Sequence, residues 1–144
     1  MTEPFDGMEV REYQPGDREA VVALWEACNL TRPWNDPDED IHRAMGGPSS
    51  TVLVGTRGVR IVASAMVGHD GHRGWVYYVS VVPDRQGKGD GRAIMHAAER
   101  WLADKGAVKV MLMIREGNGA VQGFYETLGY EVEPRISMAR WLER

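Results

Sequence analysis

The sequence predicts a mixed α/β domain with a largely antiparallel sheet. Three observations lead to this prediction. In the middle of the chain β-rich runs follow one another with only short turns between them, amphipathic helical patterns flank the later runs, and 144 residues with 43% hydrophobic content suit one globular core. We therefore expect a single domain over residues 1–144, with six or seven strands and about four helices.

The first part of the chain predicts one strand and two helices. A strand is expected over residues 8–13, followed by a helix that Asp17 caps and that ends near Cys28. Cys28 lies on the apolar side of this helix, so its thiol is expected in the core and not as a nucleophile. Pro37 suits the first turn of a short second helix that ends near residue 45.

The remaining elements follow from the same kinds of pattern. Two β-rich runs joined by residues 55–58 are typical of a hairpin, and residues 89–105 have the apolar spacing of a helix with one buried face. The run 108–114 is almost continuously apolar, as in a strand buried on both faces. The further expected elements are strands over 51–54, 59–67, 75–82, 130–132 and 136–141, and a helix over 118–128.

The composition restricts the partners and the compartment. A net charge of −4 argues against a nucleic acid or an anionic membrane surface as partner. No apolar run is long enough to span a bilayer, and the start Met1–Asp6 is acidic, unlike a basic leader, so a cytoplasmic location is expected. The four histidines and the single cysteine lack the spacing of metal ligands, so no metal is expected.

A glycine-rich loop lies between the strand that ends at Val82 and the helix that follows. Free backbone N–H groups and the positive end of the helix dipole meet there, which favours an anion. The phosphate loop of nucleoside triphosphatases does not fit, because Lys88 is followed by Gly89 where that motif has Ser or Thr. The dinucleotide fingerprint fits weakly, because its last glycine would be Arg92.

Two motifs in the same order resemble the GCN5-related N-acetyltransferase family. The first is Gln86-Gly87-Lys88-Gly89-Asp90-Gly91 after the strand end Val81-Val82-Pro83, and the second is the segment Asn118 to Tyr130. The resemblance covers nearly the whole chain and implies acetyl-coenzyme A (acetyl-CoA) as co-substrate and an amine as acceptor. Residues 32–37 and 70–74 are similar to a narrower group, the bacterial YpeA-type acetyltransferases.

The resemblance implies a donor site and a catalytic acid. The backbone of Val79, Ser80 and Val81 would pair with the pantetheine arm, and one N–H there would polarise the thioester carbonyl. Asn118 would cap its helix and contact the same arm, and Tyr125 would protonate the departing thiolate. The residues implied to hold the pyrophosphate are Gln86, Gly87, Lys88, Gly89, Asp90, Gly91 and Arg92.

Two residues of the loop depart from the family pattern. Arg85 stands where an aromatic residue is common, and Asp90 stands where an aliphatic residue is usual. A carboxylate beside a pyrophosphate should weaken binding unless it points away or pairs with Lys88 or Arg92.

The sequence does not assign the residues that contact the acceptor or the general base. Arg32, Trp34 and Asp36 lie in the connector where this family builds its acceptor wall, although Trp34 could equally pack into the core. Met113 occupies the position where relatives that acetylate ribosomal N-termini carry a glutamate, so no base is assigned. The side chains that could face the acceptor are those of His69, Asp70, His72 and Glu116.

The resemblance thus predicts an N-acetyltransferase in which a primary amine attacks acetyl-CoA directly, with Tyr125 as general acid. Two other classes stay open, a non-catalytic domain that binds or senses acyl-CoA and a partner-binding domain that kept only the fold. The amine is a small molecule, a lysine or a peptide N-terminus, and a homodimer is compatible with such a fold.

Overall fold

The computed structural model describes residues 7–143, in two compact units. Unit 1 comprises the described residues up to Met113, and unit 2 comprises those from Ile114 onward. The acidic start, Met1–Asp6, on which the expectation about a leader rested, lies outside the described residues. No helix among residues 7–143 is long and apolar enough to cross a membrane.

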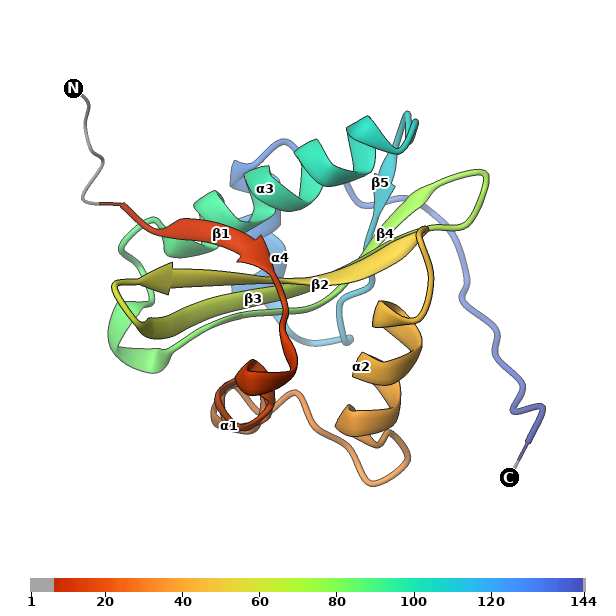
Figure 1. The fold of residues 1–144 in the computed structure, drawn as a ribbon. Helices are drawn as coiled ribbons and strands as arrows, with labels where there is room; N and C mark the ends of the chain where they lie inside the picture. Colours follow the sequence, from red (N-terminus) through yellow and green to blue (C-terminus); the bar gives the residue numbers. More distant parts are fainter. Residues whose placement is uncertain (1–6, 144) are drawn as a thin grey trace. The chain divides into compact units, whose positions relative to one another are not determined.

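Unit 1 is built on a five-stranded sheet in the order β1-β2-β3-β4-β5 (Figure 1). Its strands are β1 (Glu9–Glu12), β2 (Ser50–Arg57), β3 (Arg60–His69), β4 (Gly74–Val81) and β5 (Val110–Met111). The first four pair antiparallel, and β5 pairs parallel with β4. The predicted mixed, mostly antiparallel sheet is confirmed.

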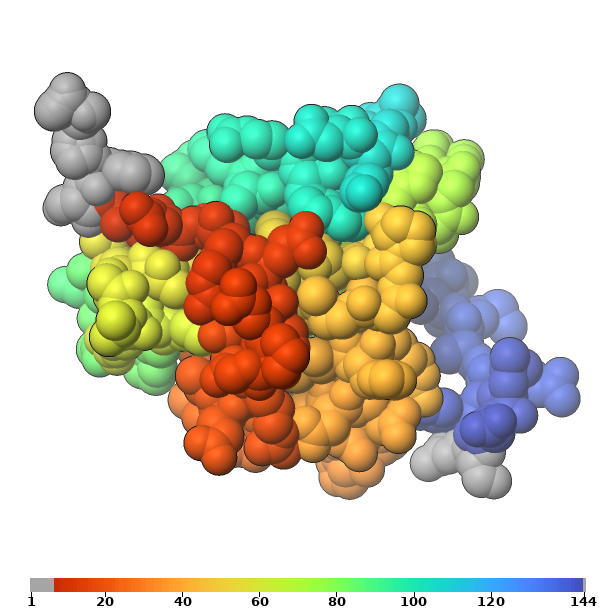
Figure 2. Space-filling view, in the orientation of Figure 1, coloured from red at the N-terminus to blue at the C-terminus, as the bar shows by residue number. Residues whose placement is uncertain are grey.

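Helices cover both faces of this sheet. The helices of unit 1 are α1 (Arg18–Ala27), α2 (Pro37–Met45) and α3 (Asp90–Asp104), and single 3-10 turns span Pro15–Asp17 and Pro83–Arg85. Figure 1 shows α3 on one side of the sheet and α1 with α2 on the other, and in Figure 2 the segment from α1 to α2 covers much of the face shown. Unit 2 contains α4 (Gly119–Thr127).

A core cluster fills the space between α1, α2 and the sheet because the apolar residues of each element recur at its own period. Its buried members are Val21, Leu24, Trp25, Ile41, Ala44, Val52 and Val54. Cys28 packs half-buried against this cluster, and its Sγ donates to the carbonyl of Val81 at 3.2 Å. Burial raises the pKa of the Cys28 thiol, so the expectation of a core residue is confirmed.

Two local predictions were wrong in detail, because strand pairing extends past the expected turn and a carboxylate expected to cap a helix bonds other groups nearby. The hairpin does not turn over residues 55–58, since β2 runs on to Arg57 and the turn is Gly58–Val59. Asp17 occupies the N-cap position of α1 without a capping hydrogen bond from its side chain. Its carboxylate accepts instead from the Arg11 guanidinium at 2.7 and 3.0 Å and from the Gln14 N–H at 2.8 Å.

The strand count was also too high. The run 108–114 forms only the two-residue β5, and Val108 is 85% exposed, so it is not buried on both faces. Residues 130–132 and 136–141 form no strand in the described part of unit 2. Their β-rich pattern is local, whereas a strand needs a neighbouring backbone with which to bond.

A bulge interrupts the regular pairing of β4 with β3. Ser80 lies opposite Ser64 and Tyr77 opposite Met66, so Tyr78 and Val79 together face the one residue between those two on β3. Tyr78 adopts φ +55°, a left-handed conformation that is uncommon for a bulky residue. The bulge changes the direction of β4 just before its last residues.

Candidate active site

The outer edge of β4 offers backbone groups to a ligand. The Val82 N–H donates to the Val62 carbonyl at 2.8 Å, which makes Ala63 and Val81 a non-hydrogen-bonded pair, so the peptide groups of Val81 point away from β3. By the same alternation the backbone N–H and carbonyl of Ser80 point toward β3. The Ser80 Oγ donates to the Tyr78 carbonyl at 3.2 Å. Within unit 1, β5 pairs only with the start of β4, at Gly74 and Trp75.

The loop after β4 leads into the N-terminus of α3. Gln86 Nε2 donates to the Val81 carbonyl at 3.0 Å, which ties the loop to the strand. Gly87 and Gly89 have φ values of +76° and +95°, and apart from the adjacent residues no described atom lies within 4 Å of a Cβ built on either. Gly89 is the N-cap of α3, whose first N–H groups have no partner within the helix.

Two exposed cations accompany these N–H groups. Lys88 and Arg92 are both exposed, and no ion pair joins either to another described side chain. Open space over the glycines, the helix N-terminus and these two side chains together fit a pyrophosphate. Gly91 is a helical residue of the first turn and adds no left-handed conformation.

Asp90 belongs to a buried ion cluster with Arg57 and Arg85, which we call the Asp90 cluster. Arg57 donates to the two carboxylate oxygens at 2.7 and 3.3 Å, and Arg85 donates to them at 2.9 and 3.2 Å. The Asp90 side chain is only 1% exposed. Burial alone would raise the pKa of Asp90, but the hydrogen bonds from Arg85 and Arg57 outweigh it and lower the pKa to about 2.

The Asp90 cluster resolves the two departures in the loop. The carboxylate is turned into the protein, and it pairs with Arg57 and Arg85, not with Lys88 or Arg92. Arg85 replaces the common aromatic residue and Asp90 replaces the usual aliphatic one. The two unusual residues form an ion pair with each other, so each compensates the charge of the other. Arg57 lies 33 positions away on β2, and nothing in its local sequence indicates this contact.

Unit 2 carries Asn118 and Tyr125 on one helix. The Asn118 side chain caps α4 by accepting from the Val121 N–H at 3.4 Å. Tyr125 is 8% exposed, and its ring makes edge contacts with Phe124 and Tyr130 at centroid distances of 5.0 and 5.8 Å. Burial raises the pKa of Tyr125 to about 12, so the phenol keeps its proton at neutral pH.

The connector between α1 and α2 is ordered by its own side chains. Arg32 donates to the carbonyls of Asn29 and Thr31, each at 2.8 Å. Asp36 caps α2 by accepting from the Asp38 N–H at 2.9 Å. Trp34 is 49% exposed, so it does not pack into the core and its ring stays available for contact.

The polar loop between β3 and β4 uses its candidate side chains to hold its own shape. Asp70 accepts from the N–H groups of His72 and Arg73 at 2.8 and 2.7 Å and from the Trp75 indole at 3.1 Å. The backbone hydrogen bonds lower the pKa of Asp70, which makes it a poor proton acceptor. His69 Nδ1 accepts from the Gly71 N–H at 3.0 Å.

Two further candidates lie exposed at the surface. His72 belongs to the loop just described, and Glu116 belongs to unit 2. Among residues 7–143, no group of three histidine, cysteine, aspartate or glutamate side chains could hold a metal ion.

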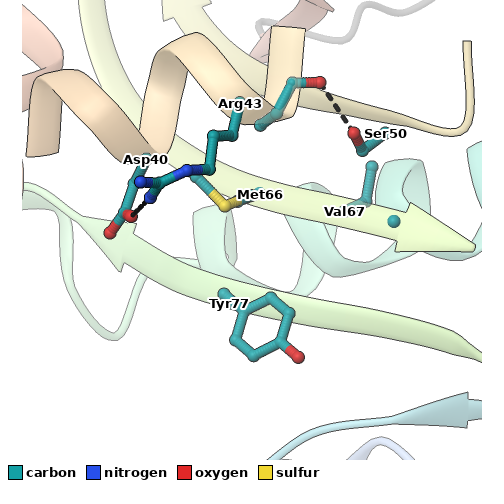
Figure 3. Close-up of a pocket in the computed structure, with 8 residues that line it drawn as sticks. Asp40, Arg43, Ser50, Met66, Val67 and Tyr77 are labelled. Atoms are coloured by element: carbon teal, nitrogen blue, oxygen red, sulfur yellow. Dashed lines mark hydrogen bonds and ion pairs between the residues drawn. The ribbon is translucent and has the colours of Figure 1, made fainter. Parts of the chain in front are cut away.

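A pocket between α2 and the sheet was missed from the sequence; we call it the α2 pocket. It has a volume of about 240 Å³ (Figure 3). Its lining comprises Asp40, Arg43, Ala44, Ser50, Met66, Val67, Gly68 and Tyr77. Figure 3 shows Asp40 and Arg43 side by side on α2, with Met66 on β3 and Tyr77 on β4. Asp40 is one of three acidic residues in the first turn of α2, so its local sequence does not distinguish it.

The α2 pocket is connected to the β4 bulge through Tyr78. The Tyr78 hydroxyl donates to Asp40 Oδ2 at 2.7 Å, and its ring stacks on Trp25 with centroids 3.8 Å apart. Burial and the hydrogen bond to Asp40 raise the pKa of Tyr78. Stacking and hydrogen bond together hold the residue whose backbone is left-handed.

Comparison with known proteins identifies the family. A sequence model described as the acetyltransferase (GNAT) family matches residues 18–130. The chain belongs to this family. It is 44% identical over 135 residues to an acetyltransferase of Pectobacterium atrosepticum, which covers 94% of this chain and 96% of that protein. The chain is therefore an enzyme of the acetyltransferase class, as the sequence predicts.

Solved structures show the same fold for this GNAT protein. A putative acetyltransferase from Agrobacterium tumefaciens superposes with a TM-score of 0.78 at 23% identity, over 92% of this chain and 99% of the other. AAC(6')-Iy, solved in complex with the bisubstrate analogue CoA-S-monomethyl-acetylneamine, has a TM-score of 0.80 at 16% identity, over 93% and 97%.

Proposed function

We propose that this enzyme transfers the acetyl group of acetyl-CoA to a primary amine by direct attack within a ternary complex. The observation that carries the proposal is the part of the β4 edge that β5 leaves unpaired within unit 1, beside an open glycine loop at the N-terminus of α3. A complex of one structural relative with a CoA-containing bisubstrate analogue supports it.

The donor is held mainly by backbone groups. The backbone of Val79 and the N–H of Val81, on the outer edge of β4, bond the pantetheine arm as an added strand would, while Ser80 keeps the edge aligned with β3. The loop residues Gln86 to Arg92 bind the pyrophosphate through N–H groups of Gly87 and Gly89 and through Lys88 and Arg92. Asp90 acts indirectly, by fixing the first turn of α3 against Arg57 and Arg85.

The chemistry then requires two actions of the protein, one at the carbonyl oxygen and one at the departing sulfur. Acetyl-CoA supplies an activated thioester when bound. An N–H at the β4 bulge stabilises negative charge on the carbonyl oxygen, and the acceptor nitrogen forms its bond to carbon as the carbon–sulfur bond breaks. The acceptor ammonium loses one proton to solvent before it attacks. Tyr125 gives its proton to the departing sulfur and regains one from the nitrogen that has attacked, so the amide and the free thiol leave with the enzyme unchanged.

We further propose that both units belong to one acetyltransferase domain, because the family match from residue 18 to residue 130 includes parts of each. The alternative is a domain that only binds acyl-CoA. Two observations favour it: no general base is assigned, and the negative charge of Asp90 would repel a pyrophosphate. The burial of Asp90 between two guanidiniums removes the second of these reasons.

The test is release of the CoA thiol from acetyl-CoA in the presence of amines, with wild type and Tyr125→Phe. We expect Tyr125→Phe to lower kcat about 100-fold or more with little change in the KM for acetyl-CoA. Tyr13→Phe, a matched change on a half-buried tyrosine outside the site, should leave kcat unchanged. Equal turnover of Tyr125→Phe and wild type would show that Tyr125 is not the general acid.

The direct attack has its own test. A ternary complex gives intersecting initial-velocity lines for the two substrates and an unmodified protein mass after incubation with acetyl-CoA alone. A protein that gains an acetyl group, together with parallel lines, would contradict direct attack.

A further inference from the structure

We propose that the α2 pocket binds the acceptor and selects a small α-amino acid with an apolar side chain. The ammonium binds Asp40, the carboxylate binds Arg43, and the side chain lies against the apolar wall of the pocket. This inference rests on the proposed function, because it names the acceptor class of the same reaction.

Asp40 has one oxygen available for an ammonium. Oδ2 accepts from the Tyr78 hydroxyl at 2.7 Å, which fixes the carboxylate in the pocket wall. Oδ1 is engaged only by a 3.6 Å ion pair with Arg43 within the part of the chain that the structure describes. That distance is too long for a hydrogen bond, so an ammonium can approach Oδ1 without displacing a short contact.

Arg43 provides the complementary charge one helical turn away. Its guanidinium lies 3.6 Å from Asp40 and 3.6 Å from Glu39, and its side chain is 71% exposed. Both ion pairs are long, so the guanidinium keeps donors for a carboxylate. An α-amino acid carries its ammonium and its carboxylate on one carbon atom, and this close spacing matches Asp40 and Arg43 standing side by side on α2 (Figure 3).

The rest of the pocket defines the size and polarity of the ligand. Ala44, Met66, Val67 and the ring of Tyr77 supply an apolar wall. The volume of about 240 Å³ lies below the roughly 300–1,000 Å³ of sites for drug-sized ligands, so it suits a molecule of amino-acid size. An aminoglycoside, with several ammonium groups on hydroxylated rings, would place a second cation near Arg43 and hydroxyls against this wall.

The position of the pocket suits the reaction. Asp40 is hydrogen-bonded to the side chain of Tyr78, whose backbone forms the β4 bulge next to Val79. The proposed ammonium site is therefore linked through the Tyr78 side chain to the strand proposed to hold the thioester. Tyr77, the preceding residue of β4, lines the pocket itself.

The experiment compares L-leucine with isopentylamine, which is the same molecule without the carboxylate. Each is titrated calorimetrically into the protein without acetyl-CoA, and each is assayed for thiol release with acetyl-CoA. The variants are Asp40→Asn and Arg43→Gln, and the matched control is Asp38→Asn, an exposed carboxylate on the same helix that pairs with Arg18. Thermal unfolding checks that each variant is folded.

We expect wild type to bind leucine about tenfold or more tightly than isopentylamine. Asp40→Asn should weaken both ligands about tenfold, Arg43→Gln should weaken leucine alone, and Asp38→Asn should change neither. No leucine binding to wild type, equal binding of the two ligands, or unchanged binding to folded Asp40→Asn would each overturn the inference.

The two proposals fail in different ways. If other amines are acetylated and leucine neither binds nor reacts, the assignment of the α2 pocket falls and the acetyltransferase proposal stands. If leucine binds with the expected pattern and no amine is acetylated, the pocket stands and the proposed reaction falls.

Discussion

Asp90 and Asp40 are the same chemical group at the start of two helices, and their surroundings differ completely. Both oxygens of Asp90 are held by two guanidiniums, and the side chain is 1% exposed. Asp40 has one oxygen bonded to Tyr78 and the other beside a cavity, in a long ion pair. The first carboxylate is part of the structure, and the second is available to a ligand.

The difference shows that a carboxylate's role depends on what already occupies its oxygens. Asp70 supports the same rule, because its oxygens are taken by two backbone N–H groups and an indole. A saturated carboxylate gains little from a new cation, since it would first have to lose hydrogen bonds of similar strength. If this rule holds, loss of the Asp90 carboxylate should have a larger effect on the fold than any change at the ligand-accessible groups.

Asp90→Asn should destabilise the fold by about 2–4 kcal/mol, because it leaves the guanidiniums of Arg57 and Arg85 without their carboxylate. Chemical denaturation measures the change. Asp84→Asn, which removes an exposed partner of Arg60, is the control and should have a much smaller effect. Equal losses in both variants would mean that the Asp90 cluster contributes no more than a surface pair.

The stabilisation by Asp90 should disappear in acid. Because the folded pKa of about 2 lies below the ordinary value of 3.8, this contribution is complete above pH 4 and is lost as the pH falls toward 2. It corresponds to about 2 kcal/mol. Denaturation curves of wild type and Asp90→Asn should therefore converge between pH 4 and pH 2, and a constant gap over this range would contradict the shifted pKa.

Gly89→Ala should raise the KM for acetyl-CoA about tenfold. The added Cβ stands in the open space over the loop, and alanine disfavours φ +95°. Gly106→Ala is a matched control, because Gly106 has φ +96° and the same open surroundings at the other end of α3. A similar KM in both variants would show that the loop does not contact the donor.

Tyr78→Phe should have the smallest effect, about a threefold weaker binding of the amine. The ring can still stack on Trp25, so only the hydroxyl that orients Asp40 is lost. Calorimetric titration with leucine measures the affinity of the variant for the amine. The KM for acetyl-CoA should stay unchanged and serves as the reference. A loss larger than that of Asp40→Asn would make Tyr78, and not Asp40, the group that holds the amine.

Local patterns predicted most of the fold. Apolar spacing located α1 to α4 and the strands β1 to β4 to within a few residues, because each pattern repeats with the period of its own element. The strands predicted over 130–132 and 136–141 failed because strand formation depends on a partner backbone that the pattern does not contain.

The arrangement of the candidate site could be predicted only where it is made of consecutive residues. The loop from Gln86 to Arg92 and the cap at Asn118 are local and were recognised from their motifs. The contact of Asp90 with Arg57 spans 33 positions and that of Asp40 with Tyr78 spans 38, so neither could be inferred from spacing. For the same reason Lys88 and Arg92, which are near Asp90 in sequence, were the wrong partners to consider.

The most direct test of the central claim compares acetyl-CoA with S-acetylpantetheine, which lacks the pyrophosphate, in calorimetric titrations. If the loop at the N-terminus of α3 binds the pyrophosphate, acetyl-CoA should bind about 100-fold or more tightly. Gly89→Ala should then remove much of that difference, while Gly106→Ala keeps it. Equal affinity of wild type for the two thioesters would contradict the account.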